Sequence, residues 1–215
     1  MHGTKDGVIE NKVQVIKKMK SFKQYFFEAI NGPKIIMIGG PGSGKSTYSN
    51  LIKKELGIAH IYTGDMMREL ARQNTPDGRK VKELLSKGEF APTPIVIDAV
   101  KDRMKKPDAM KGYVFDGFPR NVEQAEAMED KGIEYDYVVN LVVSEKEVIK
   151  RLTARGRADD TPEIIKNRIK VYHRETAPLL KYYKDEIINI KAEGDMPENI
   201  AKEIIKKVQW KTLTT

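Results

Sequence analysis

From Lys34 onward, short apolar runs alternate with longer amphipathic stretches. Short apolar runs are typical of buried strands, whereas apolar positions that recur every three or four residues are typical of helices covering a core. The pattern predicts strands at 34–39, 59–62, 112–116, 137–143 and 187–191. It predicts helices at 45–56, 64–73, 78–87, 94–106, 121–130, 144–154, 162–175, 176–185 and 197–208.

The predicted strands indicate a parallel sheet. The strand at 137–143 is apolar except at Asn140, a pattern typical of strands that are buried on both faces. Strands that alternate with helices predict right-handed βαβ units. We therefore expect an α/β protein with three layers, in which helices cover both faces of a five-stranded parallel sheet.

The segment between the second and third predicted strands contains more helix than a single crossover requires. We interpret residues 62–93 as an inserted helical lobe, and a longer crossover is the alternative interpretation.

Residues 1–33 form a predicted N-terminal extension, ahead of a domain at 34–211. Apolar residues at 9–30 recur at helical spacing, and Asn31, Gly32 and Pro33 then favour a helix end. We expect this amphipathic helix to dock on its own core or to form a homo-oligomer interface, with a membrane surface as a less favoured partner.

Composition narrows the function classes. The 215 residues include no cysteine, which excludes disulfides and thiolate metal sites. No stretch has the roughly 20 apolar residues that a membrane span needs, and the N-terminus lacks a secretory signal, so we expect a cytoplasmic protein without a membrane span. The net charge is +8, but the lysines are scattered among acidic residues, so we expect no nucleic-acid partner.

Residues 39–47, with the sequence GGPGSGKST, carry the strongest chemical signal in the chain. They match the glycine-rich phosphate-binding pattern, and they lie between a predicted strand and a predicted helix, where that pattern requires them. Backbone N–H groups and the helix dipole would attract phosphate, and Lys45 would add a full positive charge. Ser46 or Thr47 can hold Mg²⁺.

Further polar groups follow the other strands. Asp116 ends the predicted strand at 112–116, where a carboxylate can orient Mg²⁺ through water. Several separate arginines lie beyond strand ends, and the planar guanidinium fork binds phosphate oxygens bidentately. One phosphate loop with several arginines predicts two phosphorylated ligands held end to end. These arginines are Arg68, Arg120, Arg151, Arg155, Arg157 and Arg168.

The motifs GGPGSGKST, YTGDMMR, DGFPR and RLTARGRADD occur in an order that resembles the nucleoside monophosphate kinases, and the adenylate kinase family in particular. The resemblance covers residues 34 to about 208. It implies a P-loop fold of three α/β/α layers, with the helical lobe binding the monophosphate and a minimal lid at about 152–161. It also implies Mg²⁺-dependent phosphoryl transfer from ATP to AMP that gives two ADP.

The resemblance also implies a role for each matching residue. ATP would contact Gly40, Pro41, Gly42, Ser43, Gly44, Lys45, Ser46, Thr47, Arg151 and Arg155. AMP would contact Thr63, Arg68, Ala91, Gly117, Arg120, Gln124, Arg157 and Arg168. The catalytic residues would be Lys45, Arg120, Arg155, Arg157 and Arg168. Magnesium would lie at Ser46 and, through water, at Asp116, with Asp65 nearby; Asp159 and Asp160 resemble lid carboxylates.

Two positions bear on the choice of acceptor base. Gln124 can both accept from and donate to an adenine edge, and Thr63 offers a hydroxyl. Adenylate kinases resemble the chain at both positions, whereas UMP-CMP kinases usually carry asparagine and alanine there. A UMP/CMP or broad-acceptor kinase is the alternative, and Gln124 could instead be a surface residue. Motifs typical of regulatory GTPases do not occur, and the intact set of cations argues against a scaffold protein.

Three departures from the family pattern stand out. Ser46 replaces a common glycine, residues 1–33 precede the family match, and only Gly156 separates Arg155 from Arg157 in the lid. With no cysteine, we expect no zinc-type lid. So short a lid would grip the donor base weakly, which favours donors other than ATP as well.

Overall fold

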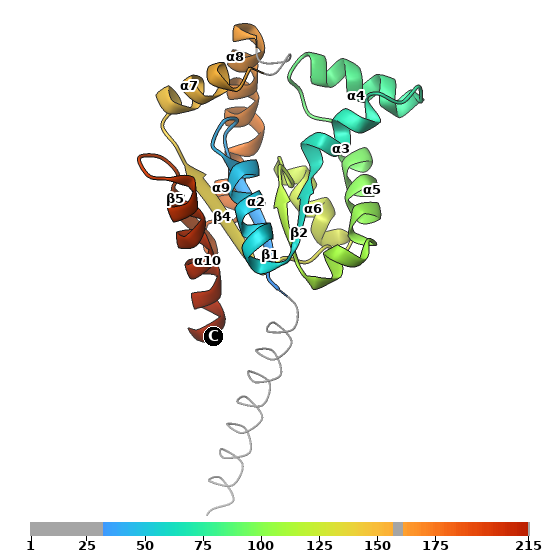
Figure 1. Cartoon of the computed structure of the whole chain (residues 1–215). Coiled ribbons are helices and arrows are strands. Elements are labelled where there is room, and N and C mark those ends of the chain that lie inside the picture. Colours follow the sequence, from blue (N-terminus) through green and yellow to red (C-terminus); the bar gives the residue numbers. More distant parts are fainter. Residues whose placement is uncertain (1–31, 157–160, 215) are drawn as a thin grey trace, which may run out of the picture.

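The computed structural model describes residues 32–156 and 161–214, and within this part a single sheet of five parallel strands forms the centre (Figure 1). The order in the sheet is β2-β3-β1-β4-β5. All five predicted strands are confirmed, with bounds that differ by at most one residue. They are β1 (Lys34–Gly39), β2 (Ala59–Tyr62), β3 (Tyr113–Asp116), β4 (Tyr137–Val142) and β5 (Ile187–Lys191).

Alternating residues of β1 show why the protein has three layers. Ile36 and Ile38 pack into one apolar cluster, whereas Ile35 and Met37 pack into another. Because successive side chains of a strand point to opposite faces, the two clusters lie on opposite sides of the sheet. Both faces are therefore covered, as the apolar runs predict.

Nine α-helices surround this sheet in the part of the chain that the structure describes. They are α2 (Lys45–Leu56), α3 (Thr63–Leu70), α4 (Pro76–Ser86), α5 (Thr93–Met104), α6 (Val122–Asp130), α7 (Glu145–Arg155), α8 (Pro162–Val171), α9 (Pro178–Tyr182) and α10 (Pro197–Thr214). A short 3₁₀ helix at Pro107–Lys111 precedes β3, and a π-helical turn at Tyr172–Thr176 separates α8 from α9.

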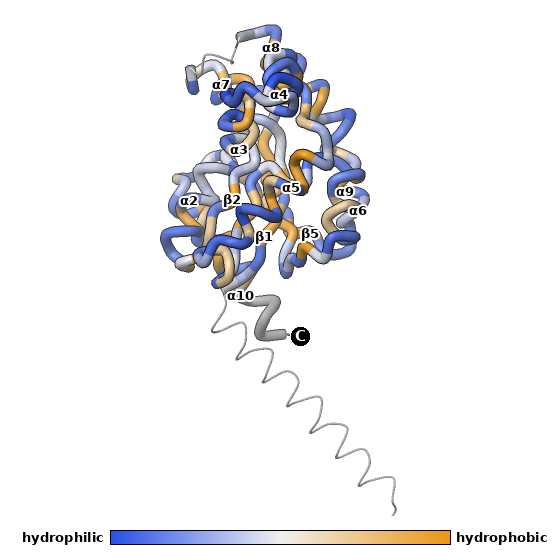
Figure 2. Tube along the Cα trace, turned by 90° about the vertical axis from the view of Figure 1, so that its right-hand side faces the viewer, coloured by the Kyte–Doolittle hydropathy of each residue, from blue (hydrophilic) through white to orange (hydrophobic). Residues whose placement is uncertain are grey.

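Helices α2 and α10 pack together on one face of the sheet, where Ile52 and Ile204 are fully buried. The opposite face is covered by α5, α6 and α9, through residues such as Met128 and Leu179. Figure 2 shows hydrophobic segments gathered in the interior, whereas α4 on the outside is largely hydrophilic. None of the described helices is long and apolar enough to cross a membrane.

The helical stretch after β2 consists of α3 and α4, which pack on each other. The next helix, α5, belongs to the layer on the sheet, since Val96 and Val100 are buried in its apolar cluster. Figure 1 shows α4 standing away from the strands, at the end of the molecule where α7 and α8 also lie. This arrangement is compatible with an inserted lobe at 62–93, whose boundaries stay a prediction.

The predicted helices at 162–175 and 176–185 differ most from the structure. Helix α8 ends at Val171, and the chain then forms the π-helical turn, in which the N–H of Ala177 donates to the carbonyl oxygen of Tyr172 at 2.9 Å. Pro178 has no N–H to continue the ladder, so α9 begins there as a separate helix. At the other end of the chain, α10 continues to Thr214, beyond the predicted end at 208.

Several predictions concern residues outside the described ranges. The amphipathic helix at 9–30, most of the extension 1–33, Arg157 and the carboxylates Asp159 and Asp160 all lie there. The predicted lid at 152–161 is described only up to Gly156 and again from Thr161.

Candidate functional site

The carboxyl ends of the parallel strands lie at one edge of the sheet, and β1 sits between β3 and β4. After β1 the chain forms β2 and β3 on one side of this strand, whereas β4 and β5 lie on the other side. A crevice is expected where the strand order changes direction in this way. A cleft of about 830 Å³ opens at this edge and is lined by the loops after β1, β3 and β5 and by the helices that follow β2 and β4.

The loop between β1 and α2 needs glycine at particular positions. Gly42 has a φ of 74°, and a Cβ atom there would lie 2.9 Å from Leu152 Cγ and 3.0 Å from the Val148 carbonyl oxygen. Gly44 has a φ of 94° and precedes α2 as its N-cap, where no side chain caps the helix. The first N–H groups of α2 are therefore not occupied by a capping side chain and can bind an anion at the cleft.

Lys45 folds back over this loop. Its Nζ donates to the carbonyl oxygens of Gly39 at 2.6 Å and Gly40 at 2.8 Å. Burial lowers the pKa of Lys45 to about 8, although the negative charge of Asp116 opposes the shift. The ammonium group is thus held at the mouth of the loop by contacts that a phosphate oxygen could replace.

Asp116 lies at the end of β3 and is 1% exposed. Its Oδ2 accepts a hydrogen bond from Ser46 Oγ at 2.6 Å and lies 3.1 Å from His60 Nε2. Burial alone would raise the pKa of Asp116. The hydrogen bonds from His60 and Ser46 and the charge of Lys45 lower the pKa by more than burial raises it, so the net pKa lies below its usual value. The structure therefore joins the two predicted magnesium ligands, with the carboxylate ionised.

Sequence reasoning missed His60, which contacts Asp116. His60 Nδ1 lies 3.1 Å from Asn50 Oδ1, so the ring bridges α2 and β3. Nothing in the local sequence reveals this, because the contact depends on the pairing of β2 with β3. Asp65 pairs with Arg68 and is not among the residues that line the cleft, and its expected place near the magnesium site stays a prediction.

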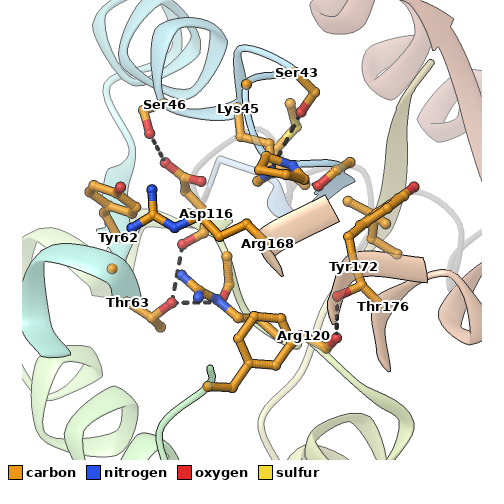
Figure 3. Close-up of a pocket in the computed structure, with 18 of the residues that line it drawn as sticks. Ser43, Lys45, Ser46, Tyr62, Thr63, Asp116, Arg120, Arg168, Tyr172 and Thr176 are labelled. Atoms are coloured by element: carbon orange, nitrogen blue, oxygen red, sulfur yellow. Dashed lines mark hydrogen bonds between the residues drawn. The ribbon is translucent and has the colours of Figure 1, made fainter. Parts of the chain in front are cut away.

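A second group of polar residues lies farther along the cleft, around Arg120. Arg120 Nε donates to the Gly117 carbonyl oxygen at 2.9 Å, and its guanidinium carbon lies 5.0 Å from the centre of the Phe90 ring. Burial lowers the pKa of Arg120, with further lowering from the charges of Arg68 and Arg168. The Thr63 hydroxyl donates to the same Gly117 carbonyl at 2.6 Å. Figure 3 shows Thr63 and Arg120 on one side of the cavity and Ser43 and Lys45 on the other.

Gln124 is buried at 1% exposure and lines the cleft, so it is not a surface glutamine. Its Oε1 accepts from the backbone N–H of Arg120 at 2.9 Å. Asn121 caps α6 by accepting from the Gln124 N–H, also at 2.9 Å, which fixes the start of that helix. The amide is therefore held in one orientation, with its oxygen toward Arg120.

Arg68 reaches the cleft from the last turn of α3. Its Nη2 donates to the Tyr62 hydroxyl at 2.9 Å and to Asp65 Oδ1 at 2.5 Å. Tyr62 and Phe90 were not identified from the sequence as residues of this site, although both line the cleft. Isolated aromatic residues give no signal that separates a cleft wall from a core.

The side of the cleft near α7 carries another cation. Arg151 Nε donates to Glu147 at 2.8 Å, and its Nη2 donates to the Ala192 carbonyl oxygen at 2.9 Å. These contacts hold its guanidinium beside the phosphate loop, where Nη1 lies 3.5 Å from the Ser43 carbonyl oxygen. Arg155 and Arg168 also line the cleft.

Nearly all of the predicted site residues that the structure describes line this one cleft. Gly40 is the exception, and it contributes its carbonyl oxygen to Lys45. Arg157 lies outside the described residues. The residues that line the cleft as predicted are Pro41, Gly42, Ser43, Gly44, Lys45, Ser46, Thr47, Thr63, Arg68, Ala91, Asp116, Gly117, Arg120, Gln124, Arg151, Arg155 and Arg168.

Comparisons with known proteins agree with this geometry. The model of the adenylate kinase family matches residues 37–188. An adenylate kinase of Rhodococcus erythropolis is 43% identical over 169 residues, which cover 77% of this chain and 93% of that protein. An adenylate kinase of Corynebacterium aurimucosum is 44% identical with the same coverage. An adenylate kinase of Mycolicibacterium smegmatis is 42% identical over 79% of this chain and 96% of that protein.

Proposed function

The chain belongs to the adenylate kinase family and transfers a phosphoryl group between ATP and AMP, and we propose that the two cationic groups of the cleft divide the two nucleotides between them. ATP binds at the phosphate loop with Lys45 and Arg151. AMP binds at the far group with Arg68 and Arg120. The observation that supports this division is the separation of the phosphate loop from the Arg120 group within one continuous cleft.

The geometry favours in-line transfer between two ligands. Phosphoryl transfer needs little covalent help from the protein, and it depends on positioning and on positive charge around the moving group. Lys45 leaves the carbonyl oxygens of Gly39 and Gly40 and neutralises charge on the transferring phosphoryl oxygens. Arg155 and Arg168 approach the same space from the lid side, and we assign Arg157 to the same role from its place in the sequence.

The residues at the end of β3 fit a magnesium ion. Ser46 and Asp116 both offer oxygen, which is the ligand type that Mg²⁺ prefers, and the carboxylate is ionised. Ser46 would hold Mg²⁺ directly and Asp116 through water. When bound there, the ion neutralises charge on the donor phosphates. His60 keeps the Asp116 carboxylate oriented toward Ser46.

The acceptor base is proposed to meet Gln124, whose fixed amide suits adenine, and Thr63 and Ala91 border the same end of the cleft. These residues favour AMP over UMP. The protein is proposed to act in the cytoplasm, where ATP and AMP interconvert, and any assembly of subunits through residues 1–33 stays a prediction.

Separate kinetic constants for the two substrates test the division of roles. Arg120→Lys keeps a charge but loses the guanidinium fork, so KM for AMP should rise about tenfold or more while KM for ATP stays within about twofold. Arg151→Ala should show the reverse. Arg72→Ala is the matched control, because Arg72 is exposed and pairs with Glu69 outside the cleft. An Arg120→Lys effect confined to ATP would contradict the assignment.

A further inference from the structure

Tyr62 occupies the junction between β2 and α3, and its surroundings fix its ring. The ring stacks on His60 with centroids 5.8 Å apart and planes at 14°. On another side, a Cβ atom at position 64 would lie only 2.6 Å from the Tyr62 ring, so the ring packs directly over Gly64. The hydroxyl group is thus carried on a ring with little freedom to move.

The guanidinium of Arg68 lies against this ring. Its Cζ is 5.2 Å from the ring centroid, and its Nη2 donates to the Tyr62 hydroxyl at 2.9 Å. Asp65 takes the same edge of the guanidinium, with Nε at 3.2 Å and Nη2 at 2.5 Å. Side chains of a helix lean toward its N-terminus, so Arg68 reaches back along α3 to both partners.

The third nitrogen of the Arg68 guanidinium, Nη1, is the one that these contacts leave available for a ligand. Within the described residues, Nη1 of Arg68 has no hydrogen-bond partner, whereas Nε and Nη2 are both occupied. Arg68 lines the cleft on the same side as Arg120. Tyr62 and Asp65 therefore occupy one edge of the guanidinium without using the N–H groups of Nη1.

We propose that Tyr62 is a positioning residue for the acceptor phosphate, because its hydroxyl and ring hold the guanidinium of Arg68 so that Nη1 faces the monophosphate of AMP. This inference deepens the proposed function and rests on its assignment of Arg68 to the acceptor. Asp65 alone would not be enough, since this carboxylate is 71% exposed and competes with water for the arginine. The hydroxyl of Tyr62 adds a contact from a ring that packs on His60 and Gly64.

Tyr62→Phe is the sharpest test, because it removes the hydroxyl and keeps the ring that packs on His60 and Gly64. KM for AMP should rise about three- to tenfold, which is less than the full loss of a hydrogen bond to a charged group, because Asp65 still holds the guanidinium in the variant. KM for ATP should not change. Adenosine has no phosphate, so its inhibition constant against AMP should stay within about twofold of the wild type. A variant that merely loosens the acceptor lobe would weaken AMP and adenosine alike, and that result would overturn the proposal.

Tyr182→Phe is the matched control. The Tyr182 hydroxyl donates to Glu129 at 2.9 Å, the same length as the Tyr62 bond, but Tyr182 does not line the cleft. Its loss should leave both KM values unchanged. Thermal unfolding of both variants shows whether either has lost stability.

A double-mutant cycle with Arg68→Ala separates this proposal from the proposed function. If Tyr62 acts through Arg68, then Tyr62→Phe should have no further effect on KM for AMP once Arg68 is alanine. Effects of the two changes that simply multiply would overturn the positioning role. If Arg68→Ala raises KM for AMP but Tyr62→Phe does not, only the positioning role fails. If Arg68→Ala leaves KM for AMP unchanged, the acceptor assignment fails and the positioning role with it.

Discussion

The fixed amide of Gln124 makes a specific prediction about acceptor choice. Because the backbone N–H of Arg120 donates to Oε1, the atom that faces Arg120 must be oxygen, and Nε2 must face another way. None of the described residues accepts from Nε2, and Gln124 lines the cleft. The site therefore offers one donor and one acceptor in a defined order.

That order suits some bases and opposes others. Adenine and cytosine present a ring nitrogen that accepts beside an amino group that donates, whereas guanine and uracil carry an exocyclic oxygen in place of the amino group. We expect AMP to be the best acceptor, CMP to follow it, and GMP and UMP to be poor. The preference for AMP over CMP would come from the size of the base, because the hydrogen-bonding pattern is shared.

Gln124→Glu reverses this pattern. The carboxylate still accepts from the backbone N–H of Arg120, but its second oxygen replaces the Nε2 donor. Two acceptors, this oxygen and the ring nitrogen of adenine, then face each other. Losing the hydrogen bond and leaving buried acceptors unpaired costs about 2–4 kcal/mol. This corresponds to a fall in kcat/KM for AMP of roughly 30- to 1000-fold. Guanine carries adjacent N–H donors that fit a carboxylate, so GMP should improve relative to AMP.

A coupled assay of ADP formation at saturating ATP, with each monophosphate in turn and a reaction without acceptor, measures these ratios. Gln73→Glu is the matched control, since Gln73 is exposed and does not line this cleft. The ratio of kcat/KM for AMP over GMP should fall at least about a hundredfold in Gln124→Glu and stay constant in the control. A ratio within about threefold of the wild type would show that Gln124 does not contact the base.

Two further predictions concern the donor side. The pKa of Lys45 is about 8 in the unliganded protein, and only the protonated amine attracts the triphosphate, so kcat/KM for ATP should fall about tenfold per pH unit above pH 8. A bound triphosphate stabilises the charged amine, so kcat should stay level over the same pH range. A profile of kcat/KM for ATP that is flat to about pH 9.5 would contradict this role of Lys45. For the range of donors, we assign Arg151, which lies beside the phosphate loop, to the donor base, and the remaining contacts go to the triphosphate that all donors share. GTP, CTP and UTP should therefore work within roughly tenfold of ATP, a gap of about 1.4 kcal/mol, and strict use of ATP would reveal a base contact that neither the sequence nor the cleft shows.

The donor half of the site was accessible from the sequence because it is continuous in the chain. Strand β1, the glycine loop and α2 follow one another at 34–56, and the loop glycines and Lys45 lie within that single segment. Local patterns therefore determine both the backbone shape and the position of the charge. The five strands were also accessible, since each is a short and mostly apolar run. Strands β1 and β3 are buried on both faces, whereas the edge strands β2 and β5 are only partly buried.

The acceptor half could only be predicted as a set of residues, because its contacts depend on how distant segments align. The pairing of β2 with β3 places His60 opposite Val114 and Tyr62 opposite Asp116, and a shift by one residue would turn His60 to the other face. No local pattern gives that register. The contact of His60 with Asp116 therefore emerged only from the structure.

The π-helical turn shows the same dependence at longer range. The helical periodicity of the sequence predicts a regular helix through residue 175, yet the chain forms a π-helical turn at Tyr172–Thr176. Such turns are rare in proteins, and those that occur often lie at functional sites. Here the Thr176 hydroxyl donates to the carbonyl oxygen of Arg120 at 2.7 Å, although the two residues are 56 positions apart. The same Arg120 residue gives its N–H to Gln124, so both its backbone groups are held by side chains. The irregular turn therefore helps to fix the arginine that we assign to the acceptor phosphate, and periodicity cannot reveal a distortion whose cause lies in a distant loop.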